Sequence, residues 1–299
     1  MSQAQILTEL SSIRDWLRYT VSQFENSDIF FGHGTSNAYD EAVWLIFSFL
    51  HLPHDTIENF LDASLTSKEK KDLLFLIEKR IKDKIPTAYL LNEAWLRDYK
   101  FYVDERVIIP RSLIAESLSK NLYPWIDSPE KIFSALDLCS GSGCLGIMMA
   151  HSFQNAIIDL VDLSEKALQV AEINISHYGL NDRIELIQSD LFDALKDKKY
   201  DLIISNPPYV NQTSADNFPM EFLKEPSMAL RSGKDGLDHT IRIISEAKHY
   251  LNDDGILIVE IGHNKEVLLN KFPKLKFQWL DVSLGNDFVF LLQTSQLPE

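Results

Sequence analysis

The residues best suited to chemistry follow the apolar run 202–205, where the chain reads Asn206-Pro207-Pro208-Tyr209. Proline lacks a backbone N–H and fixes its own φ, so two prolines after a side-chain amide form a rigid pocket floor that presents oxygen acceptors. The Asn206 oxygen and the Pro207 carbonyl can accept the two hydrogens of an NH2 group, while the Tyr209 ring covers its flat face. We therefore predict catalysis by Asn206, Pro207 and Tyr209, and substrate binding by these three and Pro208. The segment favours methylation of a weakly nucleophilic nitrogen, although a tight turn at a strand end also explains the prolines.

A glycine-rich segment follows an earlier apolar run, 132–138, and reads Cys139-Ser140-Gly141-Ser142-Gly143-Cys144-Leu145-Gly146. Glycines let the backbone turn sharply and approach a ligand, and the amides at the start of the next helix favour polar or anionic groups. We expect Ser140, Gly141 and Gly143 to bind a nucleotide-like cofactor. The spacing also satisfies GxGxxG, so a nicotinamide-dependent oxidoreductase is an alternative, but one that leaves Asn206 and its neighbours unused.

Acidic residues end or follow three successive apolar runs: Asp137, Asp162 and Asp190. The carboxyl ends of parallel strands meet at one edge of a sheet, where three carboxylates suit a ligand with a cation, a ribose and an adenine. S-adenosyl-L-methionine has these parts. We expect Asp162 to accept hydrogen bonds from the ribose, Asp190 from the adenine amino group, and Asp137 to lie near the ammonium and sulfonium. Leu191 and Asn206 complete the predicted cofactor set.

Composition limits the possible functions. With 299 residues, 45% of them hydrophobic, the chain can bury a full core and form two domains. A net charge of −15 disfavours direct nucleic-acid binding, which needs clustered Lys and Arg, and favours a basic protein as partner. Cys139 and Cys144 have no neighbouring Cys or His cluster, so we predict neither a disulfide framework nor a metal site. No apolar run reaches the roughly 20 residues that span a bilayer, and the first ten residues lack a signal pattern, so we expect a cytoplasmic protein without a membrane partner.

The N-terminal part has helical spacing. Thr66 and Glu69 form a possible capping box at the start of one helix, which continues to the break at Pro86. Two earlier stretches show the same apolar period, 3–24 and 40–51. We therefore predict a helical domain over residues 1–86, with a role in substrate recognition.

Two β-favouring runs follow, 99–103 and 106–109, separated by Asp104-Glu105. They predict a β-hairpin within a linker over residues 87–112.

From residue 113 to 299 the pattern alternates between strands and helices, which predicts a mainly parallel, doubly wound α/β sheet with helices on both faces. Two C-terminal runs without a long helix between them, 276–280 and 288–293, predict an antiparallel hairpin at the sheet edge. The remaining predicted strands lie near 132–138, 156–161, 184–188, 201–205 and 255–260.

Together these motifs resemble a class I S-adenosylmethionine-dependent methyltransferase, whose Rossmann-like domain has a seven-stranded, mainly parallel sheet. The segments Glu225–Leu230 and Gly233–Leu237, the Pro110-Arg111 link and the N-terminal helices resemble the protein glutamine methyltransferases. The resemblance covers nearly the whole chain. It implies an enzyme that transfers a methyl group from S-adenosyl-L-methionine to the side-chain amide nitrogen of a glutamine.

Two branches of this family differ in substrate. The release-factor branch modifies a Gly-Gly-Gln glutamine and continues its Pro-Arg link with a Pro-Glu-Thr-Glu type sequence, whereas here Ser112-Leu113-Ile114 follow. The segment 31–35, Phe-Gly-His-Gly-Thr, also resembles the other branch. The resemblance therefore implies large-subunit ribosomal protein L three as the substrate, with release factors as the alternative.

Other readings stay open. An adenine-amino methyltransferase acting on nucleic acid shares this pocket chemistry but needs a basic groove, which the acidic balance disfavours. A noncatalytic docking protein could retain only the fold. Four residues receive no assigned role: His33, Arg111, Glu225 and Glu260.

Overall fold

The computed structural model describes residues 2–215 and 217–298, which form two compact units. One unit holds the described residues up to Glu93 together with Pro219–Lys224. The other holds Ala94–Phe218 and the described residues from Glu225 onward. The assignment of separate functions to 1–86, 87–112 and 113–299 stays a prediction.

The first unit is helical, and its core is apolar. Trp16, Phe24 and Phe47 are fully buried at its centre, where they meet Leu73 and Ile77 from another helix. The helices are α1 Gln3–Glu9, α2 Ile13–Glu25, α3 Ala38–Phe49, α4 Ser67–Lys82 and α5 Thr87–Leu91. The predicted capping box is confirmed, because the Glu69 N–H donates to Thr66 Oγ1 and the Thr66 N–H donates to Glu69 Oε2.

The apolar period over residues 3–24 proves to belong to two helices. Leu10 ends α1 in an extended conformation, and Ser12 begins α2 as its N-cap. The Asp15 N–H donates to Ser12 Oγ at 3.2 Å, and the Ser12 N–H donates to Asp15 at 2.9 Å. This reciprocal cap satisfies amides that a continuous helix would have used itself, so the helix restarts at Ile13.

A buried arginine joins the segment 219–224 to the helices of this unit. Arg80 Nε donates to Glu41 Oε1 at 2.5 Å, and Nη1 donates to Glu221 Oε1 at 2.8 Å. Nη2 donates to the Phe30 carbonyl at 2.7 Å. His33 is also buried here, with its ring centroid 4.4 Å from that of Phe222. The chain therefore leaves the second unit at residue 218 and returns at residue 225.

The second unit opens with a short hairpin whose strands differ from the prediction. Strand β1 Ala94–Leu96 pairs antiparallel with β2 Tyr99–Phe101, with Arg97 at the turn in a left-handed conformation, φ 55°. The predicted strand at 106–109 is wrong, because Asp104 accepts hydrogen bonds from the Arg106 backbone and guanidinium and folds that stretch into a loop.

The predicted seven-stranded sheet is confirmed, in the order β5-β4-β3-β6-β7-β9-β8. Pairing is parallel from β5 to β7, and β9 runs antiparallel to both β7 and β8, as the C-terminal pattern predicts. The strands are β3 Ser134–Leu138, β4 Ile157–Asp162, β5 Ile184–Gln188, β6 Tyr200–Ser205, β7 Leu251–Glu260, β8 Gln278–Trp279 and β9 Val289–Gln293.

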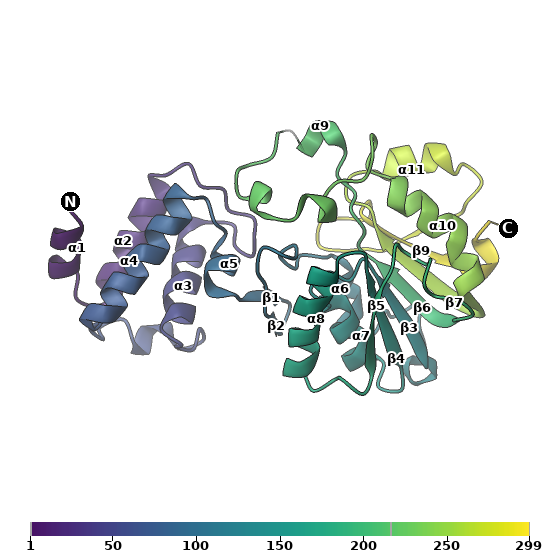
Figure 1. The fold of residues 1–299 in the computed structure, drawn as a ribbon, viewed down its shortest axis with the longest axis horizontal. Coiled ribbons are helices and arrows are strands. Elements are labelled where there is room, and N and C mark those ends of the chain that lie inside the picture. The colour runs from purple at the N-terminus through teal and green to yellow at the C-terminus, as the bar shows by residue number, and fades with distance from the viewer. Residues whose placement is uncertain (1, 216, 299) are drawn as a thin grey trace. The chain divides into compact units, whose positions relative to one another are not determined.

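Helices cover both faces of this sheet (Figure 1). Helices α7 and α8 contact β3, β4 and β5, whereas α10 and α11 bury side chains against the opposite face. The helices of this unit are α6 Ile114–Leu118, α7 Cys144–Ser152, α8 Glu165–His177, α9 Gln212–Ala215, α10 Asp238–Tyr250 and α11 Lys265–Lys271. Short 3₁₀ helices in the chain span Ile57–Asn59, Pro129–Lys131, Phe222–Lys224, Ser227–Ala229 and Thr294–Gln296.

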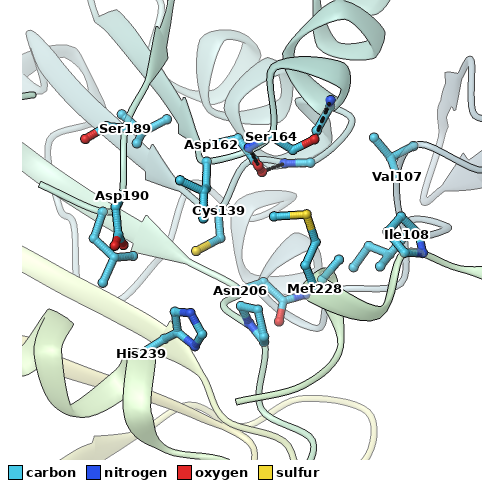
Figure 2. A pocket seen from close by; sticks show the side chains of 18 of the residues that line it. Val107, Ile108, Cys139, Asp162, Ser164, Ser189, Asp190, Asn206, Met228 and His239 are labelled. Carbon is cyan, nitrogen blue, oxygen red and sulfur yellow. Dashed lines mark hydrogen bonds between the residues drawn. The ribbon is translucent and has the colours of Figure 1, made fainter. Parts of the chain in front are cut away.

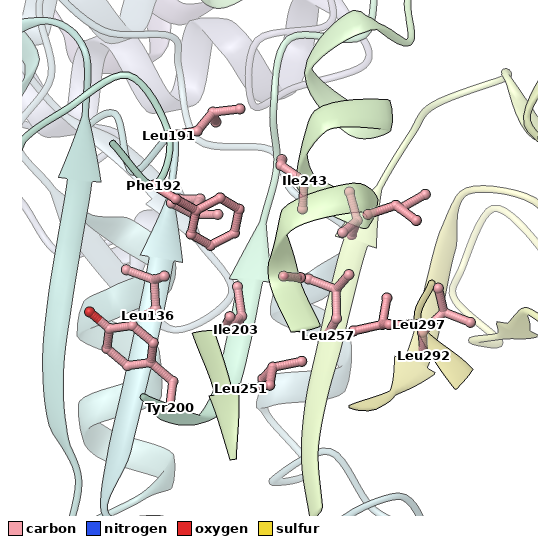
Figure 3. Close-up of a cluster of buried hydrophobic side chains, with 14 of the residues drawn as sticks. Leu136, Leu191, Phe192, Tyr200, Ile203, Ile243, Leu251, Leu257, Leu292 and Leu297 are labelled. Carbon is pink, nitrogen blue, oxygen red and sulfur yellow. The ribbon is translucent and has the colours of Figure 1, made fainter. Parts of the chain in front are cut away.

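Along each strand, side chains point alternately into the core on the α10 face of the sheet and toward the opposite face. Leu136 points into this core with Ile203 and Leu257, where they meet Ile243 of α10 (Figure 3). Leu138 belongs to the same core. Because successive strand residues point to opposite faces, Asp137 points toward α7 instead. A well-packed core on one face thus fixes which side chains reach the other.

Candidate functional site

The loop between β3 and α7 is held by the carboxylate of Asp162 at the end of β4. Gly141 adopts φ 54°, a left-handed conformation that favours glycine, and its N–H donates to Asp162 Oδ2 at 2.9 Å. Asp162 Oδ1 accepts a second hydrogen bond from the Ser164 N–H at 2.8 Å. Burial raises the pKa of Asp162, while these two N–H donors lower it. The predicted cofactor loop and the predicted ribose acceptor are therefore one connected structure.

Close packing at the start of α7 brings a second carboxylate to the same loop. A Cβ on Gly146 would lie 2.4 Å from Leu160 Cδ1, so any side chain here would force Leu160 out of its present position between α7 and β4. The Gly146 N–H donates to Asp137 Oδ2 at 2.9 Å. Asp137 is fully buried, and this burial raises its pKa to about 8. Its other oxygen, Oδ1, has no hydrogen-bond partner among the described residues.

The segment after β6 is fixed by contacts on both sides of Asn206. Before it, Ser205 Oγ donates to the Leu138 carbonyl at 2.8 Å. After it, the Tyr209 carbonyl accepts from Asn264 Nδ2 at 2.8 Å, and Tyr209 Oη donates to Glu260 Oε1 at 3.1 Å. Asn206 Oδ1 itself is buried and accepts no hydrogen bond from any described residue. An unsatisfied buried acceptor costs free energy, which a ligand donor can recover.

The acidic residues that the sequence left without a role prove to hold the site together. Glu260 is buried, and its Oε2 accepts from Ser112 Oγ at 2.6 Å and from the Leu113 N–H at 2.9 Å. Together with its contact to Tyr209, Glu260 therefore joins three segments of this unit. Burial raises the pKa of Glu260, and these donors lower it.

Glu225 forms a bidentate ion pair with Arg111. The distances are 2.6 Å from Nη1 to Oε1 and 2.8 Å from Nη2 to Oε2, and the Ile109 N–H also donates to Glu225 Oε1 at 2.9 Å. The Glu225 side chain is completely buried. This pair fixes the loop before α6 against the segment that follows residue 224.

Two cavities meet at Asn206. The larger, of about 700 Å³ including the open solvent at its mouth, includes six predicted site residues in its lining: Gly141, Asp162, Asp190, Leu191, Asn206 and Pro208 (Figure 2). A smaller one, of about 350 Å³ on the same measure, is lined by Asp137, Ser140, Gly141 and Asn206, together with Arg111. Three predicted residues, Gly143, Pro207 and Tyr209, are not in the lining of either cavity. Gly143 instead lies against Leu160 and Ala171.

The structure adds lining residues that the sequence did not indicate. Residues 106–108 of the loop after β2 contribute one wall of the larger cavity, and Met228 and His239 contribute others. Their positions depend on loops that return to the sheet edge from distant parts of the chain. Only the Glu225–Leu230 segment carried a signal, and that signal came from resemblance rather than from its residue types.

The cavities fit the parts of S-adenosyl-L-methionine in their donors and acceptors. Asp137 Oδ1 and Ser140 Oγ are buried without a hydrogen-bond partner among the described residues, and they lie at the smaller cavity. Buried polar groups normally have partners, so a ligand that enters the cavity beside these two atoms can complete their bonding. With Asp162 and Asp190 at the larger cavity, the site offers acidic acceptors to a cation and to hydroxyl and amino groups.

The described residues contain neither a helix suited to a membrane nor a cluster suited to a metal ion. None of their helices combines the length and apolar character that crossing a bilayer requires. No group of three or more His, Cys, Asp or Glu side chains among them is arranged to hold a metal ion.

Comparisons with known proteins agree with this architecture. Residues 118–237 match the family described as Methyltransferase small domain. The catalytic domain of hMettl16, solved in complex with the MAT2A 3'UTR hairpin 6, has a TM-score of 0.51 at 14% identity, with 75% of this chain and 80% of that chain covered. At this identity the likeness shows the fold alone.

Curated relatives are much closer in sequence. The ribosomal protein uL3 glutamine methyltransferase of Neisseria gonorrhoeae is 53% identical over 98% of both chains. The protein of the same name from Burkholderia pseudomallei is 48% identical over 97% of both chains. With its methyltransferase fold and near full-length similarity, this chain belongs to the family of ribosomal protein uL3 glutamine methyltransferases.

Proposed function

We propose that this protein transfers a methyl group from S-adenosyl-L-methionine to the side-chain amide nitrogen of a glutamine in ribosomal protein uL3. The names of its relatives support the substrate. The observation that carries the chemistry is the buried, unsatisfied Asn206 Oδ1 at the point where two cavities meet. Release factors are the alternative protein substrate, and an adenine amino group is the more distant one.

An amide nitrogen is a poor nucleophile because its lone pair is delocalised into the carbonyl group. Deprotonation is no remedy, since no ordinary side chain is basic enough. In the proposed site, Asn206 Oδ1 and the Pro207 carbonyl accept the two N–H hydrogens and orient the nitrogen toward the methyl carbon. Positioning of this kind removes much of the entropic part of the barrier.

The same acceptors act on the charge that develops. S-adenosyl-L-methionine, when bound, supplies an electrophilic methyl group on a sulfonium centre. As the nitrogen gains positive charge, its N–H groups become stronger donors, so Asn206 Oδ1 and the Pro207 carbonyl bind the transition state more tightly than the substrate. Tyr209 lines neither cavity in the ligand-free protein, but Glu260 holds it close to Asn206, and in this proposal its ring covers the amide plane of the bound glutamine. After methyl transfer the nitrogen releases its extra proton to water.

The cofactor is held, in this proposal, by groups along the sheet edge. Asp137 and Ser140 would bind the amino-acid end, with Gly141 in close backbone approach. Asp162 would accept from the ribose, and Leu191 would contact the adenine beside Asp190. Gly143 does not contact the cofactor in this proposal but lets the cofactor loop pack against Leu160 and Ala171. The acidic set favours a ligand that carries a positive charge.

The helical part of the chain is proposed to select the protein substrate. The pocket at Asn206 recognises one side chain and cannot by itself tell one glutamine-bearing protein from another. Exchanging residues 1–86 for the corresponding part of a release-factor enzyme should redirect activity, and a chimera with unchanged preference would refute the division of roles.

Because ribosomal proteins and their assembly are cytoplasmic in bacteria, we propose the same location for this enzyme.

The acceptor atom can be tested directly. Purified uL3 is incubated with the protein and with S-adenosyl-L-methionine carrying a labelled methyl group, and the product is then hydrolysed in acid. Methylation on an amide nitrogen predicts that the label is released as methylamine, because hydrolysis splits the amide bond. Label that stays on an amino acid places the methyl group on another atom and rejects the proposed chemistry. The Asn206→Ala variant serves as the control for enzyme-dependent transfer.

A further inference from the structure

A histidine in the larger cavity has no part in the chemistry proposed above. His239 is the second residue of α10, is half-buried, and lines the cavity together with Asp190 and Asn206 (Figure 2). Its Nδ1 is 2.7 Å from Ser232 Oγ. Nε2, on the opposite edge of the ring, has no hydrogen-bond partner among the described residues. A fixed imidazole with one free nitrogen at a cavity is suited to bind a ligand.

The contact with Ser232 determines which nitrogen carries the proton. Ser232 is fully buried, and its Oγ already accepts a hydrogen bond from the His239 N–H at 3.2 Å. Within the described part of the chain, His239 Nδ1 is the one acceptor in reach of the Ser232 hydroxyl hydrogen. Buried hydroxyls donate when an acceptor is available, so the Ser232 O–H donates to Nδ1. The neutral ring therefore carries its hydrogen on Nε2, as a donor.

Ser232 is itself held beside the proposed catalytic segment. Its N–H donates to the Val210 carbonyl at 3.1 Å, and the Val210 N–H donates to the Leu230 carbonyl at 2.9 Å. Val210 directly follows Tyr209. The orientation of the His239 ring is thus set by the same backbone that positions Asn206.

The groups around His239 favour the neutral form. Burial is the main effect and lowers the pKa of His239, and the charge of Arg242 lowers it further. Asp190 and Asp238 act in the opposite direction. A neutral ring with Nε2–H is consistent with this balance.

Asp190 provides a complementary acceptor. Its Oδ1 lies 2.9 Å from Arg242 Nη1, which leaves Oδ2 without a partner among the described residues. Arg242 is one helical turn after His239 on α10, and it also donates to the Asp190 carbonyl at 3.3 Å. The helix therefore orients Asp190 while presenting the imidazole donor. One acceptor and one donor at the same cavity match a base that has an amino group next to a ring nitrogen.

We propose that His239 donates a hydrogen bond from Nε2–H to a ring nitrogen of the cofactor's adenine, beside the amino group that Asp190 accepts. This rests on the proposed use of S-adenosyl-L-methionine and adds a residue that selects adenine over other bases. Hypoxanthine carries a carbonyl oxygen where adenine has the amino group, and this oxygen cannot donate a hydrogen bond to Asp190. The site therefore favours adenine over hypoxanthine. Ser232 is a positioning residue, because it acts through the imidazole.

The test is calorimetric binding of S-adenosyl-L-homocysteine, which needs no turnover. The variants are His239→Leu, which removes the donor, and His239→Gln, whose amide N–H₂ reaches a similar position. The matched control is His249→Leu, an exposed histidine on the same helix. A lost neutral hydrogen bond predicts about three- to tenfold weaker binding for His239→Leu, with His239→Gln and the control close to wild type.

Two cofactor analogues identify the atom, each with carbon in place of one ring nitrogen next to the amino group. Wild type should bind one of them about three- to tenfold more weakly than the parent compound, and His239→Leu should show no such difference, because the interaction is already absent. Equal affinity of His239→Leu and the control, or equal losses with the analogues in wild type and variant, would overturn the proposal. If wild type bound none of these compounds, the proposed cofactor itself would fall, and this inference with it.

Discussion

Replacing Asp137 by asparagine should stabilise the ligand-free protein and weaken its cofactor complex. The carboxyl group is fully buried and accepts one hydrogen bond, from the Gly146 N–H, and burial raises its pKa from 3.8 to about 8. The folded state therefore binds this proton more tightly than the unfolded state. The protonated carboxyl group therefore contributes its full stabilisation of the folded state below about pH 4, and this contribution is lost as the pH rises toward 8.

The size of the effect follows from the difference between the two pKa values. Each pH unit between them costs roughly 1.4 kcal/mol, so at pH 7 the free energy of unfolding loses on the order of 4 kcal/mol to this one group. Asparagine has nearly the same shape, accepts the Gly146 N–H through its oxygen, and does not titrate. We expect the variant to be more stable than wild type above pH 5, with a gain that grows up to about pH 8.

Urea unfolding of both proteins at several pH values between 4 and 9 measures this gain. Binding of S-adenosyl-L-homocysteine should weaken in the variant by about ten- to a hundredfold, because a buried charged hydrogen bond to the ligand ammonium is lost. A stability difference that does not change with pH would refute the assignment of a raised pKa. Unchanged binding would remove Asp137 from the cofactor site.

Three further changes test other parts of the site. Asn206→Ala should lower kcat about a hundred- to a thousandfold with an unchanged circular dichroism spectrum, and an active variant would exclude the amide grip. Asp162→Ala should weaken calorimetric binding of S-adenosyl-L-methionine, and unchanged affinity would reject its ribose role. Arg111→Gln leaves the completely buried Glu225 carboxylate without its countercharge and should cost about 3–5 kcal/mol in urea unfolding. The matched control is Arg14→Gln, which breaks the exposed Arg14–Asp62 pair and should leave the urea midpoint close to that of wild type.

The sheet and the cofactor loop were predictable because their signals are local. Apolar runs of strand length, each followed by an acidic residue, appear as β3, β4 and β5, and the glycines that follow β3 form the expected turn. Gly141 and Asp162 even bond directly, as residues at neighbouring strand ends can. Local propensity, strand period and turn chemistry agreed here, which is why the pattern was sufficient.

The parts that were missed depend on long-range contacts. Strand β2 pairs with the earlier strand β1 and not with residues 106–109. Asp104 accepts a hydrogen bond from the Arg106 N–H, and this local turn competes with strand formation in a way that strand propensity does not include. Arg80 and Glu221 are 141 residues apart, and no periodicity links them. His239 reaches the cavity only because α10 begins at the sheet edge, so its residue type alone gave no signal.

The most direct test of the central claim compares two protein substrates. Methyl transfer from labelled S-adenosyl-L-methionine is measured in parallel on purified uL3 and on a release factor, with mass spectrometry to locate the modified residue. We predict label on one glutamine of uL3 and none on the release factor. Label on the release factor alone would keep the mechanism and reject the substrate, and label on neither protein would contradict the proposed activity.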